Sequence, residues 1–303
     1  MAYPSRPYQS EADYALMRAL LVEIAALEGP LTYYHLGDLD WWRFSANDPG
    51  EAVRQVRLWF DGERLVGFGW PSGSGIEFVA HPRHAPVEAE ILAWGEGRRP
   101  ADGEGRRFTA WSYEHHRARN QLLRSRGYER SAAHFRLNVR ALDADPPAPA
   151  LPAGYRIRHV RGEEDVAARV EVHRDAFSPS RMTVAKHLAV MSAPTYRPEL
   201  DLVVEAPDGS FAAFCLVWHD AANRTGEFEP VGCHSAHRRL GLTRAVLFEG
   251  MRRLRALGAT SCVVFSSGAA EAEPARRLYA AAGFELRARL YAWELQERGG
   301  GDA

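Results

Sequence analysis

Residues 227–258 constrain the fold of this chain more than any other stretch, because they combine a strand, a glycine-containing turn and an amphipathic helix. The turn contains the sequence Arg238-x-x-Gly241-x-Thr243. Apolar residues then recur at a helical spacing, at Leu242, Val246, Leu247, Met251 and Leu254. Gly258 follows, where a helix commonly ends. The pattern predicts a β-strand that leads through a tight turn into a long α-helix.

A turn of this kind favours the binding of an anion. Gly241 lacks a Cβ atom, so the backbone can approach a ligand closely. The first N–H groups of the following helix have no partners inside the helix, and the positive end of the helix dipole lies beside them. Arg238, Arg239 and Arg244 add positive charge around the same point. The stretch therefore predicts a phosphate-binding turn.

Two motifs resemble those of a known enzyme family. The turn motif resembles the R/Q-x-x-G-x-G/A signature of the GNAT N-acetyltransferase superfamily, with Thr243 where that family usually has glycine or alanine. Residues 275–284 contain Ala-x-x-Leu-Tyr-x-x-x-Gly-Phe, which is similar to the A-x-x-L-Y-x-x-x-G-F ending of the family. The two motifs occur in the family's order, separated by about a helix and a strand.

The chain contains a second, weaker copy of the pattern. Residues 61–70 resemble residues 208–218, and residues 122–129 resemble residues 278–285. The resemblance implies an α/β (α+β) protein with two tandem GNAT-like domains. Each domain is expected to have a mixed, mostly antiparallel central sheet flanked by helices, which is the domain plan of mycothiol synthase.

A linker separates the two copies. Residues 143–152 contain four prolines and three alanines, a composition that supports neither a helix nor a strand ladder. We therefore predict a degenerate GNAT-like domain at residues 1–146 and a CoA-binding GNAT domain at residues 147–303. Residues 31–50 carry aromatic residues among acids, which we interpret as core or interface and not as a ligand site.

The two copies differ at the turn. The first copy has no glycine there, and Pro86, Glu88 and Glu90 stand where phosphates would lie. A carboxylate repels a pyrophosphate, and a proline removes an N–H donor. We expect that the first domain does not bind CoA in the usual way and serves as a scaffold or as one wall of the acceptor site.

The resemblance implies acetyl-CoA as co-substrate of the second domain. In the family, a backbone N–H on the strand before the turn contacts the thioester oxygen, and Val231 is the matching position here. The residues implied for cofactor binding are Val231, Gly232, Cys233, Arg238, Arg239, Leu240, Gly241, Leu242, Thr243 and Arg244. The family often has an asparagine contact to CoA where this chain has Ala272.

Acyl transfer to an amine needs a base, because only the neutral amine attacks. In the family a glutamate on or beside this strand often acts as the base, which implies Glu229, with Glu227 as second choice on the same face at period two. Tyr279 matches the tyrosine that serves as general acid near the CoA sulfur. Trp218, His219 and Glu227 are candidate substrate-binding residues, and His219 is an alternative base.

Composition narrows the class of protein. The chain has 303 residues and a formal net charge of −1, so we expect no nucleic-acid or membrane partner. Three cysteines occur without C-x-x-C spacing, which fits a reducing cytoplasm. Adjacent histidines such as His115 and His116 lack the carboxylate-rich spacing of a metal site, so we expect no metal. We expect a monomer or a homodimer.

These observations lead to one function, with a mycothiol-synthase-like step on an aminoglycosyl thiol precursor as its rival among enzymes, and to two further alternatives. We expect an acyl-CoA-dependent N-acyltransferase, with acetyl-CoA as donor, that acts on a small-molecule amine by direct attack in a ternary complex. The first alternative is a catalytically silent protein that binds CoA or senses a small molecule, which Thr243 and Ala272 favour. The second is an N-acetyltransferase that acts on proteins or peptides. Acceptor loops vary freely on one fold, so the acceptor stays open.

Overall fold

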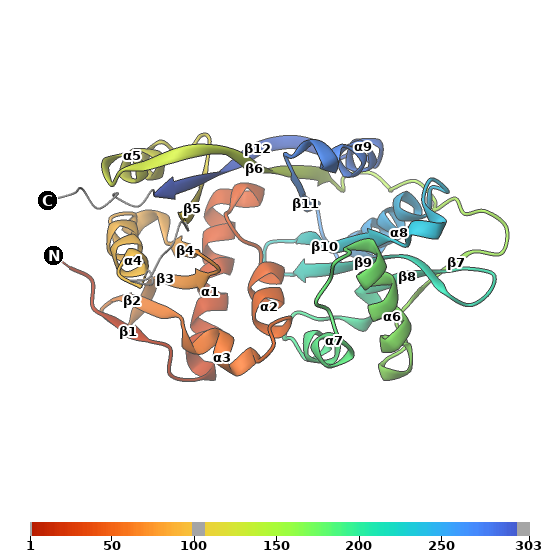
Figure 1. The fold of residues 1–303 in the computed structure, drawn as a ribbon, viewed down its shortest axis with the longest axis horizontal. Helices are drawn as coiled ribbons and strands as arrows, with labels where there is room; N and C mark the ends of the chain where they lie inside the picture. The colour runs from red at the N-terminus through yellow and green to blue at the C-terminus, as the bar shows by residue number, and fades with distance from the viewer. Residues whose placement is uncertain (1, 99–106, 296–303) are drawn as a thin grey trace, which may run out of the picture.

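A single twisted sheet runs through the whole protein (Figure 1). The computed structural model describes residues 2–98 and 107–295. In these residues twelve strands join in the order β1-β2-β3-β4-β5-β12-β6-β11-β10-β9-β8-β7. The pairs β4–β5 and β10–β11 are parallel, and the remaining neighbours are antiparallel.

The two halves of the chain contain the same succession of elements, except that the first half has one more α-helix, α3, before its second strand. The first half consists of β1 (Ser5–Pro7), α1 (Glu11–Glu28), α2 (Leu36–Phe44), α3 (Pro49–Arg54), β2 (Arg57–Asp61), β3 (Arg64–Ser72), β4 (Gly75–Ala80), α4 (Val87–Glu96), β5 (Phe108–Tyr113), α5 (Arg117–Ser125) and β6 (Tyr128–Ala141). The second half consists of β7 (Arg156–His159), α6 (Glu163–Ala176), α7 (Val184–Met191), β8 (Asp201–Glu205), β9 (Phe211–Asp220), β10 (Thr225–Cys233), α8 (Leu242–Ala256), β11 (Ser261–Ser267), α9 (Glu273–Ala281) and β12 (Glu285–Leu295).

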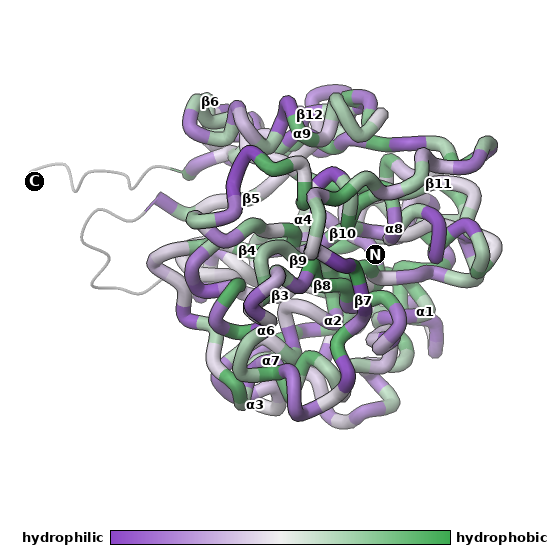
Figure 2. The backbone as a smooth tube through the Cα atoms, turned by 90° about the vertical axis from the view of Figure 1, so that its right-hand side faces the viewer, coloured by the Kyte–Doolittle hydropathy of each residue, from purple (hydrophilic) through white to green (hydrophobic). Residues whose placement is uncertain are grey.

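Helices cover both faces of the sheet. Helices α1, α2, α6 and α7 pack on one face, and α4, α5, α8 and α9 pack on the other. The apolar stripe of α1 is buried from Tyr14 to Ile24. In the second half, every residue of β8 and β9 is buried. Figure 2 shows the hydrophobic stretches of these strands in the middle of the molecule.

The last strands of the two halves are exchanged. Strand β12, from the end of the second half, lies between β5 and β6 of the first half. Strand β6, from the first half, pairs along its C-terminal part with β11 of the second half, for example Leu137 opposite Phe265. Each half therefore completes the sheet of the other.

Residues 31–50 hold two helices that the sequence pattern did not predict. His35 and Asp38 form a capping box that starts α2, in which the Gly37 N–H donates to His35 Nδ1 and the His35 N–H donates to Asp38. A Cβ atom at Gly37 would lie 2.3 Å from Trp218, so only glycine lets α2 approach β9 of the second half this closely. The helix is an interface element between the halves.

A buried carboxylate fixes α2 in this position. Asp40 is fully buried and accepts hydrogen bonds from the Tyr14 hydroxyl at 2.7 Å and from Arg18 at 2.6 Å. Its second oxygen accepts from the backbone N–H of Thr195, in the second half, at 2.8 Å. The two halves are thus held together by polar contacts as well as by the common sheet.

The predicted fold class is confirmed, because each half contributes helices to both faces of a mixed, mostly antiparallel sheet. The sequence analysis did not predict that the two sheets are one. The boundary at residues 146 and 147 stays a prediction, and residues 143–154 contain no regular element.

The exchange predicts that the second half does not fold by itself. A fragment of residues 147–303 would leave the edge of β11 unpaired and would deprive β12 of both neighbours. We expect this fragment to be insoluble or unfolded by circular dichroism. Co-expression with residues 1–146 should give a soluble complex, and a fragment 147–303 that folds cooperatively alone would contradict the prediction.

Candidate active site

Strands β10 and β11 separate partway along their length. They pair in parallel only from Thr225 to Glu227 on β10 and from Ser261 to Val263 on β11. Beyond these residues each strand continues, to Cys233 and Ser267, without pairing to the other. The edge of β10 that faces the gap therefore offers backbone groups to a ligand instead of to a strand.

A β-bulge shapes β10 at the start of this gap. Phe228 lies opposite Val217 and Val231 lies opposite Cys215, so β10 has one extra residue between them. The Trp218 indole N–H donates to the carbonyl oxygen of Glu229 at 2.7 Å. Trp218 itself is completely buried under α2. It thus supports the bulge from beneath.

The bulge places Glu229 in a partly desolvated environment. Its side chain is half-buried, and burial raises its pKa to about 7. Glu227 is only 1% exposed, and burial, with the nearby charge of Glu229, raises its pKa well above the ordinary value. Glu229, whose pKa lies near neutral pH, is therefore suited to exchange protons there.

The first half contributes two further polar groups to this cluster. Asp38 of α2 is close enough to Glu227 and Glu229 for their charges to add to burial and raise its pKa well above the ordinary value. His35 Nδ1 lies 3.5 Å from Glu227 Oε2, and burial lowers the pKa of this histidine. Sequence analysis missed both residues. The His-x-x-Asp spacing of the capping box was the signal that could have found α2.

Two atoms of this cluster lack hydrogen-bond partners among the described residues, although they are buried. They are His35 Nε2 and Glu227 Oε2. His35 also lines a cavity of about 240 Å³ between the halves, together with Thr225, Asn223 and Ser261. Buried polar atoms normally have partners. The cavity therefore combines room for a small molecule with an unpaired polar atom on one of its lining residues, His35.

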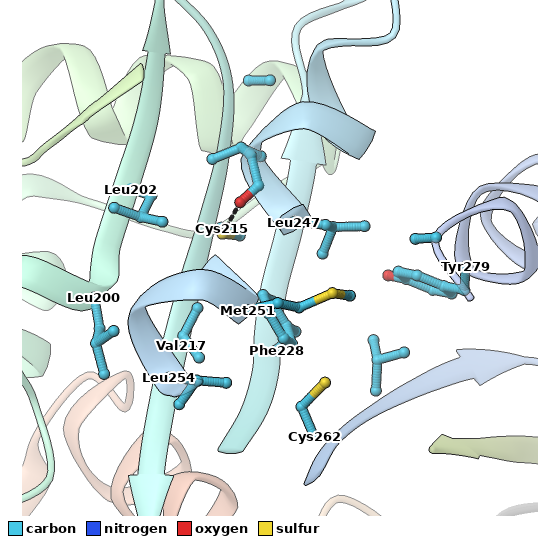
Figure 3. Packing of buried hydrophobic residues seen from close by; sticks show 14 of the residues in the cluster. Leu200, Leu202, Cys215, Val217, Phe228, Leu247, Met251, Leu254, Cys262 and Tyr279 are labelled. Carbon is cyan, nitrogen blue, oxygen red and sulfur yellow. Dashed lines mark hydrogen bonds between the residues drawn. The ribbon is translucent and has the colours of Figure 1, made fainter. Parts of the chain in front are cut away.

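Tyr279 stands on the opposite face of the sheet, at the gap. Figure 3 shows its side chain on α9, with the hydroxyl directed toward α8 near Leu247 and Met251. Burial, together with the charge of Glu229, raises the pKa of Tyr279. The hydroxyl is therefore protonated at neutral pH and is available as a proton donor. Glu229 and Tyr279, predicted as a pair, are close enough to influence each other electrostatically.

The turn after β10 has the features that an anion site requires. Gly241 has φ +78° and is the N-cap of α8, with no side-chain cap for the first N–H groups of the helix. A Cβ atom at Gly241 would meet nothing within 4 Å, so open space lies in front of the turn. Among the described residues, Arg238, Arg239 and Arg244 have no ion-pair partner. Pyrophosphate oxygens fit this set of donors.

The remaining predicted cofactor residues lie around the turn. Val231 and Gly232 are in the part of β10 that no longer pairs with β11. Burial raises the pKa of the Cys233 thiol, which donates weakly to the carbonyls of His234 and His237 at 3.6 Å. Leu240 is exposed, Leu242 is buried in the core below α8, and Thr243 is half-buried.

His219 lies apart from the other predicted substrate-binding residues. It is opposite Gly226 on β10, whereas Trp218 is opposite Glu227. Because side chains alternate along a strand, His219 points to the face of the sheet away from Glu227. The structure thus brings Trp218, Glu227 and Glu229 together and leaves His219 outside the cluster.

Side chains largely fill the corresponding gap in the first half and leave a cavity of about 90 Å³ that Glu88 and Arg119 line. Arg119 is 2% exposed and donates to Glu88 Oε1 through Nε at 3.0 Å and Nη2 at 2.6 Å. Its guanidinium group stacks on Tyr33 and Phe78. The turn there has Pro86 at the N-cap of α4 and Glu88 in the first helical turn. This half retains the strand geometry but not the anion site.

Comparisons with known proteins show which proteins this chain resembles. Residues 170–284 match the model of the acetyltransferase (GNAT) family. The chain is 31% identical over 198 residues to a mycothiol acetyltransferase of Kineococcus radiotolerans and spans 63% of that protein's length. It is 27% identical to the mycothiol acetyltransferase of Streptomyces scabiei, across 86% of this chain and 85% of that protein.

Solved structures share the fold over the full length. A tandem GNAT protein from the clavulanic acid biosynthesis pathway superimposes with a TM-score of 0.64 and 18% identity, covering 98% of this chain and 99% of that one. The resemblance to a tandem GNAT protein that the motifs predicted is therefore confirmed.

The described residues contain neither a candidate metal site nor a candidate membrane-spanning helix. Residues 2–98 and 107–295 contain no cluster of three or more metal-ligating side chains. In the same part of the chain, no helix combines the length and the apolar character needed to span a membrane.

The turn geometry predicts the effect of a charge at Gly241. In Gly241→Glu a carboxylate would project into the open space before the turn, where it would repel a phosphate. We expect acetyl-CoA affinity to fall about a hundredfold, because a lost charged hydrogen bond costs about 1.5–3 kcal/mol. Titration calorimetry measures the change. Gly258→Glu is the matched control, since Gly258 also has positive φ and open space but lies after the other end of α8. Equal losses in both variants would contradict the assignment.

The filled gap of the first half predicts the stoichiometry of binding. Glu88, Arg119 and Pro86 occupy the positions that a cofactor would need there. We expect calorimetric titration of the full chain with acetyl-CoA to give about one site per chain. Two equivalent sites would contradict this interpretation of the Arg119–Glu88 pair.

Proposed function

We propose that this chain, which resembles tandem GNAT proteins over nearly its whole length, is an N-acetyltransferase whose second half binds acetyl-CoA and transfers the acetyl group to a small-molecule amine in a ternary complex. The observation that carries the proposal is the gap between β10 and β11, with Glu229 at its edge, Tyr279 beside it and the anion-binding turn at its end. These groups are the base, the acid and the cofactor anchor that acetyl transfer requires.

Each residue has a defined part in the proposed reaction. Acetyl-CoA supplies the electrophilic thioester. Glu229, with a pKa near 7, accepts the proton of the acceptor ammonium so that the neutral amine forms an N–C bond to the acetyl carbon. As the C–S bond breaks, Tyr279 donates a proton to the leaving thiolate, and the second proton lost by the amide nitrogen restores the tyrosine hydroxyl. Backbone N–H groups on the free edge of β10, of which Val231 is the candidate, polarise the thioester oxygen.

The acceptor site is proposed to lie between the two halves. His35 and Asp38 of α2 face Glu227 there, beside the cavity of about 240 Å³. The ionised carboxylate of Glu229 would attract an acceptor that carries a positive charge before it reacts. Similarity to mycothiol acetyltransferases supports a mycothiol-related amine as the first acceptor to test.

The alternative function is that of a non-catalytic protein that binds CoA, and two residues favour it. Thr243 and Ala272 depart from the family pattern at the cofactor, which would suit a protein that binds CoA without turnover. A thiol-release assay over a panel of amines separates the two functions. Release of CoA with at least one amine supports the enzyme, and binding of acetyl-CoA without release from any amine supports the sensor.

The assignment of the base predicts a pH–rate profile. Glu229 must be deprotonated to act, so the wild-type rate should rise with pH and level off above about pH 7. Glu229→Gln should lower the rate at neutral pH by roughly a hundred- to ten-thousandfold, and the loss should shrink at higher pH as more amine is already neutral. The profile is measured with saturating acetyl-CoA and an active acceptor.

Two other variants serve as comparisons for Glu229→Gln. Tyr279→Phe should lose about tenfold, because a thiol with a pKa near 8.5 leaves fairly well unaided. Glu227→Gln leaves in place the burial that raises the pKa of Glu229, so it should retain the inflection near pH 7. A loss in Glu229→Gln that is the same at every pH would show that the carboxylate positions the acceptor without taking its proton.

A further inference from the structure

The linker between the two halves runs along the outer side of the cofactor helix. Two of its residues, Ala148 and Ala150, line a cavity of about 110 Å³ together with the start of α8. The α8 side of the cavity is formed by Gly241, Arg244, Ala245 and Phe248. This surface is continuous with the anion-binding turn, because Gly241 belongs to both.

Contacts at both ends hold the linker against α8. At its start, Arg255 of α8 donates to the Leu142 carbonyl at 3.2 Å and pairs with Asp145 at 2.6 Å. Just after its end, the Tyr155 hydroxyl and His237 Nδ1, in the turn before α8, are 3.0 Å apart. Proline is stiff in such a segment, so residues 146–152 keep an extended path between these two anchors.

The cavity has a consistent chemical character. Its walls are the methyl groups of three alanines, the ring of Phe248 and the guanidinium-bearing Arg244. Guanidinium groups stack on planar rings and bind phosphate oxygens. The volume is several times the roughly 10–15 Å³ that one water requires. A planar ring joined to phosphate fits these walls better than a purely apolar or a purely charged group.

Charge on the linker is arranged so that it does not oppose such a ligand. Asp145 pairs with Arg255, which follows Arg244 by eleven positions and so lies roughly 16 Å further along the helix at 1.5 Å per residue. Arg244 keeps no ion-pair partner within the described residues. The positive charge at the cavity is therefore not neutralised by the linker.

We propose that the linker forms one wall of the cofactor site and that the nucleotide end of acetyl-CoA occupies the cavity between Ala148, Ala150 and α8. This inference rests on the proposed function, which supplies acetyl-CoA as donor. It adds a role for the segment that joins the two halves. The linker is then a specificity element for a nucleotide-bearing donor and not only a tether.

The test compares donors with and without the nucleotide. Ala150→Phe in the full chain fills the cavity from the linker side, and Ala153→Phe, at an exposed linker position that does not line the cavity, is the matched control. Affinity is measured by calorimetry for acetyl-CoA and for S-acetyl-4′-phosphopantetheine, which lacks the nucleotide. Ala148→Phe repeats the test from the second lining position.

We expect Ala150→Phe to weaken acetyl-CoA binding at least about tenfold, a loss of about 1.4 kcal/mol. Binding of S-acetyl-4′-phosphopantetheine should change less than about twofold, and Ala153→Phe should behave like the wild type. Unchanged acetyl-CoA affinity in both lining variants, or equal losses for both donors, would overturn the inference. A wild-type protein that binds neither donor would instead refute the proposed function, and the inference with it.

Discussion

The exchange of β6 and β12 is the constraint on which the rest of the structure depends. Because each strand pairs in the sheet of the other half, the two halves cannot change their relative position without breaking ladders in both. This rigid arrangement keeps α2 of the first half against β9 and β10 of the second. The acid cluster around Glu227 therefore depends on a half of the chain whose own cofactor gap is filled.

Burial, more than any specific charge, separates the tasks of the acids in that cluster. Glu227, Glu229 and Asp38 all have raised pKa values, and burial is the first cause in each case. The half-buried Glu229 has a pKa of about 7. The pKa of the fully buried Glu227 is raised well above its ordinary value, which favours the neutral form. Two carboxyl groups with different environments thus arise from the same residue type, two positions apart on one strand.

Local patterns in the sequence predicted most elements but not their pairing. The α1 stripe, the strand–turn–helix at Gly241 and the tandem plan were readable, because periodicity and turn residues act over a few positions. The path of β12 into the first half could not be predicted from the sequence, since strand pairing is set by contacts between residues far apart in the chain. The same limit hid Asp38, which meets Glu227 only after α2 has packed on the second half. The alternation assumed for Glu227 and Glu229 also ignored the bulge that follows Phe228.

The exchanged strands also set the order in which this protein can be completed on the ribosome. Strand β5 emerges early, but its partner β12 is the final strand of the chain. At roughly 5–20 residues per second, the interval between them is on the order of ten to thirty seconds. Throughout that time the nascent first half presents an open β-edge that the mature protein never exposes. The edge of β5 therefore has to avoid wrong partners during synthesis, before the active site is assembled.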